Sequence, residues 1–255
     1  MTGPGKVWIG TSGYVYRHWR KGIFYPQGLP AREELGYFAT KFGTVELNNP
    51  FYRLPTAGMF QRWRESTPST FRFAVKASRY ITHLKRLVNV EDELALFLSR
   101  ADHLGPKLGP ILFQLPPTLQ LELPRLEQFL ALLSSSRRWA IEFRHPSWHT
   151  KEVYELLTES GAALCIPVGG GLDPDRVTTA PFTYLRMHRG REPAGGFTDH
   201  ELASWARQIR ALRSAGKEAY VYFNNDWGEY AVRDALKLGA LLDDDRSLVS
   251  SRPSG

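Results

Sequence analysis

The chain has 255 residues, of which 42% are hydrophobic and 13% aromatic, so it can bury the core of one large α/β domain or two small ones. No apolar run reaches the roughly 18 residues of a membrane-spanning helix, and the N-terminal residues show no signal-peptide pattern. The single cysteine, Cys165, excludes an internal disulfide and a cysteine-based metal cluster, and it fits a reducing cytoplasm, where we expect the protein to be located.

The formal net charge of the chain is +7 and its pI is close to 9.5. A basic balance of this size permits an anionic partner, either a nucleic acid or a phosphorylated metabolite. The alternative is a solvated basic surface without a specific partner, because the positive excess is spread along the sequence rather than gathered in a tail.

Eight short apolar segments are predicted to be strands, and most of them alternate with segments whose apolar residues recur at helical spacing. In chain order, the predicted strands cover residues 7–10, 44–48, 71–76, 111–114, 139–144, 163–166, 182–188 and 219–225. The predicted helices cover residues 32–42, 59–66, 91–104, 123–133, 151–160, 198–215 and 229–242. Residues 243–255 are expected to form a disordered tail.

Alternation of strands and helices predicts parallel strands joined by right-handed crossovers. Eight such units in about 235 residues match the size of a closed (β/α)₈ barrel. The main alternative is an open, doubly wound sheet, but Gly10-Thr-Ser-Gly13 after the first strand lacks the spacing of a dinucleotide-binding loop. We therefore predict a single-domain TIM barrel comprising residues 1–255, with its core at residues 7–242.

Polar residues lie at the carboxyl ends of seven of the predicted strands. Side chains two residues apart on a strand point to the same face, as Glu142 and Arg144 do, and the carboxyl ends of barrel strands converge on one mouth. The predicted site residues are Ser12, Glu46, Asn48, Lys76, Gln114, Glu142, Arg144, Arg186, His188 and Asn224.

The charges of this set suggest an anion-binding site. Two carboxylates face one lysine and two arginines, which leaves about one positive charge, and arginine and lysine both bind phosphate or carboxylate groups. Glu46, Glu142 and His188 are the candidate catalytic residues, with the glutamates as general acid and base if their surroundings separate their pKa values. The other residues of the set would bind the substrate. The alternative is an ion-pair network that fills the barrel without binding a ligand.

No cofactor is predicted, and no residue is assigned as a metal ligand. A divalent cation held by Glu46, Glu142 and His188 is the alternative that this residue set supports. Against it, the sequence has no HExxH motif, and three basic residues in the same mouth would oppose a cation.

Several other residues are weaker candidates. His83 follows the third strand and could reach the mouth or lie on a surface loop. The aromatic pairs Phe24-Tyr25 and Phe51-Tyr52 could stack on a base or sugar ring, or could pack their loops against the barrel. Gly169-Gly-Gly171 could cradle a phosphate but lacks a following Lys-Ser/Thr. Cys165 lies between apolar neighbours and is expected in the core.

The chain also carries an ordered series of blocks: Ile9-Gly-Thr-Ser-Gly13, Phe24-Tyr-Pro26, Thr44-Val-Glu-Leu-Asn48, Phe51-Tyr-Arg-Leu-Pro55, Phe73-Ala-Val-Lys76, Ile81-Thr-His83, Leu108-Gly-Pro-Ile-Leu-Phe-Gln-Leu-Pro-Pro117, Glu142-Phe-Arg-His145, Tyr184-Leu-Arg-Met-His188 and Tyr222-Phe-Asn-Asn225. With these blocks, residues 7–242 resemble the domain of unknown function 72 family, also called YecE-like. The resemblance implies a TIM barrel and supplies no reaction. Similar proteins often carry an aspartate at the end of strand six, where this chain has Ile166-Pro167.

The sequence leaves open whether the protein is an enzyme. We predict a mouth that acts on a phosphate-bearing, anionic substrate by hydrolysis or another acid–base step. One alternative is a nucleic-acid-binding protein or nuclease that uses the basic surface and the loop aromatics. A further alternative is a barrel that binds a ligand without catalysis. The expected partner is a small anionic molecule or a nucleic acid, and no membrane contact is expected.

Overall fold

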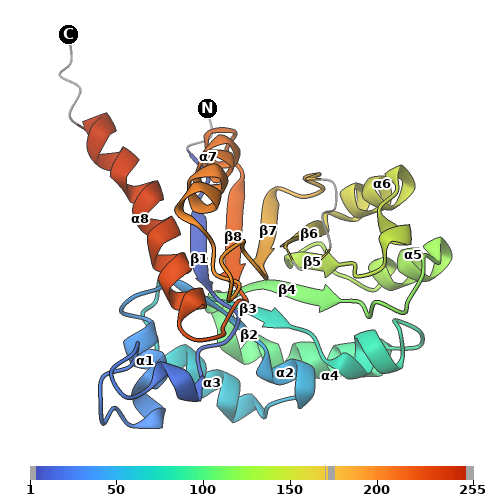
Figure 1. The fold of residues 1–255 in the computed structure, drawn as a ribbon. Helices are drawn as coiled ribbons and strands as arrows, with labels where there is room; N and C mark the ends of the chain where they lie inside the picture. The colour runs from blue at the N-terminus through green and yellow to red at the C-terminus, as the bar shows by residue number, and fades with distance from the viewer. Residues whose placement is uncertain (1–3, 170, 172–175, 251–255) are drawn as a thin grey trace.

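A computed structural model of the chain describes residues 4–169, 171 and 176–250 (Figure 1). Its eight strands are β1 Val7–Thr11, β2 Thr44–Leu47, β3 Arg72–Lys76, β4 Leu108–Gln114, β5 Trp139–Glu142, β6 Ala163–Val168, β7 Phe182–Met187 and β8 Glu218–Phe223. They are hydrogen-bonded in the order β1-β8-β7-β6-β5-β4-β3-β2, and neighbouring strands run parallel. The predicted (β/α)₈ TIM barrel in a single domain is confirmed.

The barrel closes where β1 meets β2. The backbone N–H of Gly13 donates to the carbonyl oxygen of Glu46 at 2.8 Å, and Ser12 forms an isolated parallel bridge with Glu46. Gly10 permits this approach, because a Cβ atom at that position would lie 2.1 Å from the carbonyl oxygen of Thr44. The two ends of the sheet therefore meet through backbone contacts that leave no room for a side chain at Gly10.

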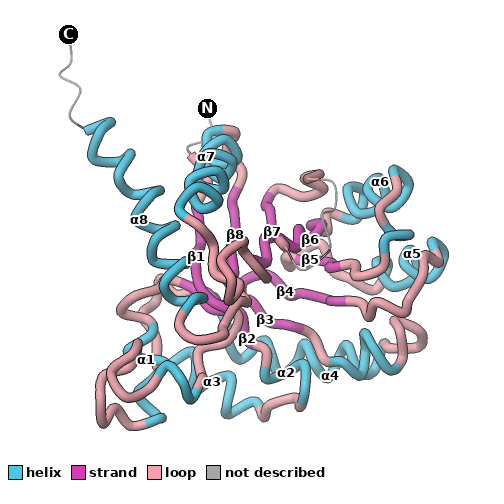
Figure 2. Tube along the Cα trace, in the orientation of Figure 1, coloured by secondary structure: helices cyan, strands magenta, loops and turns pink. Residues whose placement is uncertain are grey.

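Helices surround the strands on the outside, as Figure 2 shows in cyan and magenta. The α-helices are α1 Glu34–Phe38, α2 Asn49–Tyr52, α3 Ala57–Glu65, α4 Glu91–Ala101, α5 Leu123–Ala131, α6 Lys151–Ser160, α7 Asp199–Ser214 and α8 Tyr230–Ser250. Short 3₁₀ segments cover Arg17–Trp19, Ala31–Glu33, Asp102–Lys107 and Pro146–Trp148, and a π-helical turn covers Tyr80–Leu84. None of the helices described has the length and apolar character needed to cross a bilayer.

Two separate apolar clusters stabilise the barrel. The larger lies between the strands and the outer helices, and the smaller fills the barrel interior with residues such as Leu112, Ala140, Cys165, Tyr184 and Tyr222. These interior side chains alternate along each strand with outward-facing ones, as the two-residue period requires. Apolar side chains therefore fill the barrel interior beneath the polar residues at the carboxyl ends of the strands.

Two regions differ from the sequence-based expectation. The helix expected at residues 32–42 is instead a 3₁₀ turn, the short helix α1 and a further turn, where Thr40 donates its hydroxyl to the carbonyl of Tyr37 at 2.7 Å. Helix α8 continues to Ser250, where a disordered tail was expected, and residues 251–255 lie outside the described part of the chain.

Candidate active site at the barrel mouth

Arg186 is the centre of the polar cluster at the carboxyl ends of the strands. From β7 it reaches Glu46 on β2, to which Nε and Nη2 donate at 3.0 and 2.8 Å. Its Nη1 donates to Glu142 on β5 at 2.8 Å. Both glutamates have no exposed side-chain surface, and Arg186 is only 2% exposed. One guanidinium therefore joins three strands around the lumen.

Arg186 keeps both buried carboxylates ionised. Burial is the largest influence on each pKa and raises it, but the charge of Arg186 and the hydrogen bonds around each carboxylate outweigh burial. The pKa of Glu46 is lowered, and that of Glu142 lies well below its ordinary value of 4.5. Both glutamates therefore carry a negative charge near neutral pH.

A second group of contacts extends from Glu142 to β7 and β8. Arg144 forms an ion pair with Glu142, although its Nε and the carboxylate Oε1 are not aligned as a hydrogen bond. His188 Nε2 lies 3.0 Å from Arg144 Nη2 and 3.5 Å from Glu142 Oε1, while its Nδ1 lies 3.0 Å from the side-chain amide of Asn224. Because a guanidinium only donates, His188 accepts at Nε2.

Burial is the largest influence on His188 and lowers its pKa, and Arg186 and Arg144 lower it further, against the raising effect of Glu142. A neutral imidazole that accepts at Nε2 carries its proton on Nδ1. The amide of Asn224 then presents its oxygen rather than its nitrogen to that proton, because the two ends of an amide differ only by a flip of the group. The contact with Arg144 thus determines that Nε2 of His188 is the accepting nitrogen, and Asn224 can satisfy Nδ1 through its amide oxygen.

Lys76 is the cation of the mouth that has no carboxylate within ion-pair distance among the described residues. Its Nζ donates to Gln114 Oε1 at 2.7 Å and lies 3.9 Å from the ring centre of Phe51. The residue is 8% exposed. Burial, followed by the charge of Arg186, lowers its pKa to about 8. The charge balance of the described mouth is therefore three cations against two carboxylates at neutral pH.

Ser12 and Asn48 belong to the same mouth but to no side-chain hydrogen-bond network. Ser12 Oγ and Asn48 Oδ1 are buried and have no hydrogen-bond partner among the described residues. Ser12 pairs with Glu46 through the backbone, and Asn48 directly follows β2. Unpartnered buried oxygens are costly unless a ligand or water satisfies them. Of the ten predicted residues, the other eight form a continuous set of contacts.

Sequence reasoning missed Tyr184 as a member of this cluster, and it considered Phe51 only as a stacking face or a loop-packing residue. Tyr184 donates its hydroxyl to Glu46 Oε2 at 2.7 Å, and Phe51 presents its ring to Lys76. Tyr184 precedes Arg186 by two residues, so the strand period could have identified it. Cys165 lies inside the barrel as expected, with its Sγ 3.9 Å from Glu142 Oε2, and burial raises the pKa of its thiol well above the ordinary value.

A family model described as "Protein of unknown function DUF72" matches residues 8–255. The chain belongs to the DUF72 family. Among relatives, it is 34% identical to the UPF0759 protein YecE of Escherichia coli K12 over 156 residues, or 61% of this chain and 54% of YecE. The alignment thus spans about half the length of YecE. The UPF0759 protein YunF of Bacillus subtilis 168 is 27% identical over 89% of this chain and 93% of its own length.

Solved DUF72 structures share this fold. A DUF72 family protein of Thermotoga maritima MSB8 is similar with a TM-score of 0.82 and 29% identity, covering 93% of this chain and 99% of that one. One from Enterococcus faecalis V583 gives a TM-score of 0.76 over 94% of this chain and 98% of its own, at 21% identity, which supports the fold alone. The names of these relatives state no reaction.

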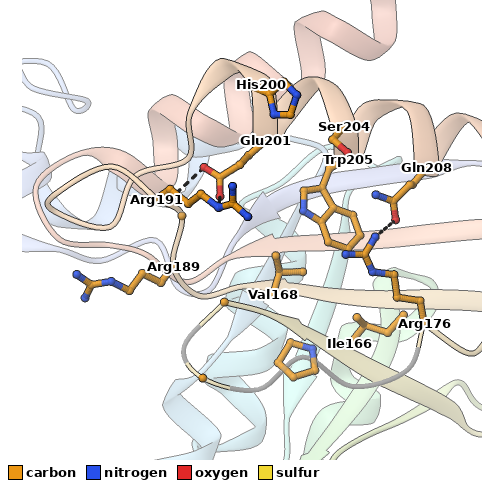
Figure 3. A pocket seen from close by; sticks show the side chains of 14 residues that line it. Ile166, Val168, Arg176, Arg189, Arg191, His200, Glu201, Ser204, Trp205 and Gln208 are labelled. Carbon is orange, nitrogen blue, oxygen red and sulfur yellow. Dashed lines mark hydrogen bonds and ion pairs between the residues drawn. The ribbon is translucent and has the colours of Figure 1, made fainter.

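A cavity of about 620 Å³ lies beside the mouth of this DUF72 barrel, between the ends of β6 and β7 and the first turns of α7 (Figure 3). Arg176 donates to Gln208 at 2.6 Å and lies 4.7 Å from the centre of the Trp205 ring. Arg191 pairs with Glu201 at 3.8 Å. None of the ten predicted site residues lines this cavity. Gly169 and Gly171 border it, whereas Gly170 lies outside the described residues.

The loop aromatics divide into two groups. Phe24 and Tyr25 pack into the hydrophobic core, and Phe51 packs against His83 with ring centres 5.0 Å apart. In contrast, Tyr52 is 73% exposed and Trp227, in the loop after β8, is 77% exposed. No group of three or more His, Cys, Asp or Glu side chains within the described residues is arranged to hold a metal ion.

Proposed function

We propose that the barrel mouth binds a small phosphate-bearing molecule and promotes an acid–base step on it, such as hydrolysis. The observation that carries this proposal is the excess of cations over carboxylates at the mouth, where Lys76 has no ionic partner among the residues that the structure describes. Keeping an ammonium in a largely buried position is costly unless an anion accompanies it. A phosphate would supply that charge and could accept hydrogen bonds from Lys76 and from Arg144.

Arg186 supports the site without contacting the ligand. All three of its nitrogens donate to Glu46 or Glu142, so the guanidinium is already engaged by the protein's own carboxylates. Lys76 and Arg144 are more accessible, because the side chain of Arg144 is 22% exposed and Lys76 uses one hydrogen-bond donor on Gln114. We therefore assign Lys76 and Arg144 to the phosphate, with Ser12, Asn48 and Gln114 as neutral contacts and Arg186 as the positioning residue.

The lowered pKa values make the glutamates bases or charge-stabilising groups rather than proton donors. Glu142 is the more accessible candidate base by geometry, since its Oε1 forms an ion pair with Arg144 but has no aligned hydrogen bond. Glu46 is held in a bidentate pair and by Tyr184. The proton donor for a leaving group would then be Lys76 or a water molecule, while His188 and Asn224 orient the substrate.

The binding step is tested by calorimetric titration with phosphate monoesters, using sugar phosphates and nucleoside monophosphates. Lys76→Met should weaken binding at least tenfold, because it removes the uncompensated charge. Lys151→Met, on the exposed surface of α6, should bind as the unchanged protein does. Failure of every monoester to bind, or equal affinity in Lys76→Met, would contradict the proposal. Once a substrate is found, Glu142→Gln should abolish turnover while circular dichroism remains unchanged.

Nucleic-acid binding is the second candidate, favoured by the exposed rings of Tyr52 and Trp227. Exposed aromatic side chains next to basic groups can stack on unpaired bases. Single-stranded oligonucleotides should then quench the tryptophan fluorescence, and their affinity should fall steeply with salt. Tyr52→Ala and Trp227→Ala should weaken oligonucleotide binding, whereas Leu96→Ala, at an exposed non-aromatic position of α4, should leave it unchanged. Binding that does not change with salt would contradict polynucleotide recognition.

A further inference from the structure

The surroundings of Lys76 suit a nucleophilic amine as well as an anion-binding ammonium group. Its Nζ touches a neutral acceptor, Gln114 Oε1, at 2.7 Å and the face of Phe51 at 3.9 Å, without an ion pair among the described residues. A carboxylate partner would hold the amine in its protonated form. The amide oxygen of Gln114 instead orients the amine and adds no charge that would hold the proton.

Two cations close to Lys76 also favour the neutral amine. The charges of Arg186 and Arg144 lower its pKa, after burial as the largest influence, while Glu46 and Glu142 raise it. At the resulting pKa of about 8, roughly a tenth of the amine is neutral at pH 7, far more than for an ordinary lysine. Desolvation and neighbouring cations are the means by which lysines become nucleophiles for carbonyl carbons.

We propose that Lys76 condenses with the carbonyl group of an anionic aldehyde or ketone and forms an imine at the barrel mouth. The Nζ–carbon bond forms, the carbonyl oxygen leaves as water with the two amine protons, and one further proton from solvent gives the iminium. This inference rests on the proposed function, because Arg144 holds the anionic group of the same substrate.

The iminium fits the charges already present. It carries one positive charge, as the ammonium did, so the balance of three cations and two carboxylates is unchanged. Glu46 and Glu142, whose charges act on Nζ, stabilise the iminium electrostatically. An iminium acidifies the neighbouring C–H bond, and Glu142 is the ionised base available to remove that proton. The acid–base step of the proposed function would then be a proton abstraction.

Reductive trapping tests the imine directly. The full chain is incubated with sodium cyanoborohydride and with dihydroxyacetone phosphate, pyruvate or uncharged dihydroxyacetone, and the adducts are located by peptide mass spectrometry. We expect one saturable adduct per chain at Lys76 with a charged carbonyl compound, formed at least tenfold faster than with dihydroxyacetone. Lys76→Arg should lose this adduct, whereas Lys151→Arg should keep it.

The outcomes separate this inference from the proposed function. If phosphate monoesters bind through Lys76 but no adduct forms there, or if adducts are scattered over surface lysines, the imine is wrong and the anion site stands. If Lys76 is trapped by pyruvate and dihydroxyacetone equally fast, the anionic substrate class is wrong. Circular dichroism of Lys76→Arg shows that loss of the adduct does not reflect unfolding.

Discussion

Arg186 holds the carboxylate of Glu46 in a bidentate pair, with its Nε 3.0 Å from Oε2 and its Nη2 2.8 Å from Oε1. The residues lie on β7 and β2, which are not neighbours in the sheet, so the pair crosses the barrel lumen. Parallel N–H···O bonds of this kind fix geometry as well as charge. Because the remaining Nη1 binds Glu142, loss of Arg186 would leave two buried carboxylates without their main partner.

Replacing Arg186 should therefore destabilise the fold strongly. We expect Arg186→Met to lower the free energy of unfolding by about 3–5 kcal/mol, the usual cost of breaking a buried ion pair from one side. Urea denaturation followed by circular dichroism measures this change. Arg207→Met, at an exposed position of α7, should cost less than about 0.5 kcal/mol. Equal stability of the two variants would mean that water or protonation compensates the carboxylates.

The carboxylates of Glu46 and Glu142 should make the free energy of unfolding depend on pH in the acid range. Arg186 and the hydrogen bonds outweigh burial and depress both folded-state pKa values, so below about pH 4.5 the unfolded chain binds more protons than the folded chain. Their stabilising contribution is complete above that pH and is lost as pH falls through the depressed values. Urea denaturation between pH 7 and pH 3 should show this loss. Glu142→Gln should reduce the pH dependence, whereas Glu159→Gln, exposed on α6, should leave it unchanged.

The sequence was sufficient to predict the barrel and to place most of the polar residues at its mouth, but it did not identify Tyr184. Strand parity and the convergence of carboxyl ends in a parallel barrel place Glu46, Glu142 and Arg186 together without any knowledge of their contacts. It could not predict which cation pairs with which carboxylate. That assignment depends on the reach of each side chain across the lumen. It places Arg186 between two buried carboxylates and leaves Lys76 without an ion pair within the described part of the chain.

Loop-borne features were harder to predict for a similar reason. Phe51 and Tyr52 are adjacent in the sequence, yet one covers Lys76 and His83 while the other is exposed. Adjacent residues on the short helix α2 point in different directions, so the placement depends on how that helix docks. The helix expected at residues 32–42 was misjudged because apolar spacing alone does not fix where a helix ends.

Closure of the barrel at β1 and β2 gives a further prediction. Gly10→Ala should lower the free energy of unfolding by about 1–3 kcal/mol or more, because the new Cβ would meet the backbone carbonyl of Thr44, which cannot move aside like a flexible side chain. Gly239→Ala, within helix α8 and with nothing within 4 Å of the added Cβ, should instead be neutral or stabilising by about 1 kcal/mol. Thermal and urea denaturation of both variants check this difference. If Gly10→Ala unfolded at the same temperature and urea concentration as the unchanged protein, β1 and β2 would be able to move apart to admit the new Cβ.

Anion binding at the mouth should weaken as Lys76 loses its proton. The charged groups that act most on its Nζ are Arg186, Glu46, Glu142 and Arg144, and burial with the arginines lowers its pKa to about 8. Affinity should be constant below that pH and should fall as pH rises through it, because only the protonated amine attracts an anion. Sulfate is the suitable probe for calorimetry, since its own charge does not change in this range. Lys76→Arg keeps its charge at all these pH values, so its sulfate affinity should stay flat from pH 7 to 9.5. A decline of the same size in Lys76→Arg would assign the titration to another group.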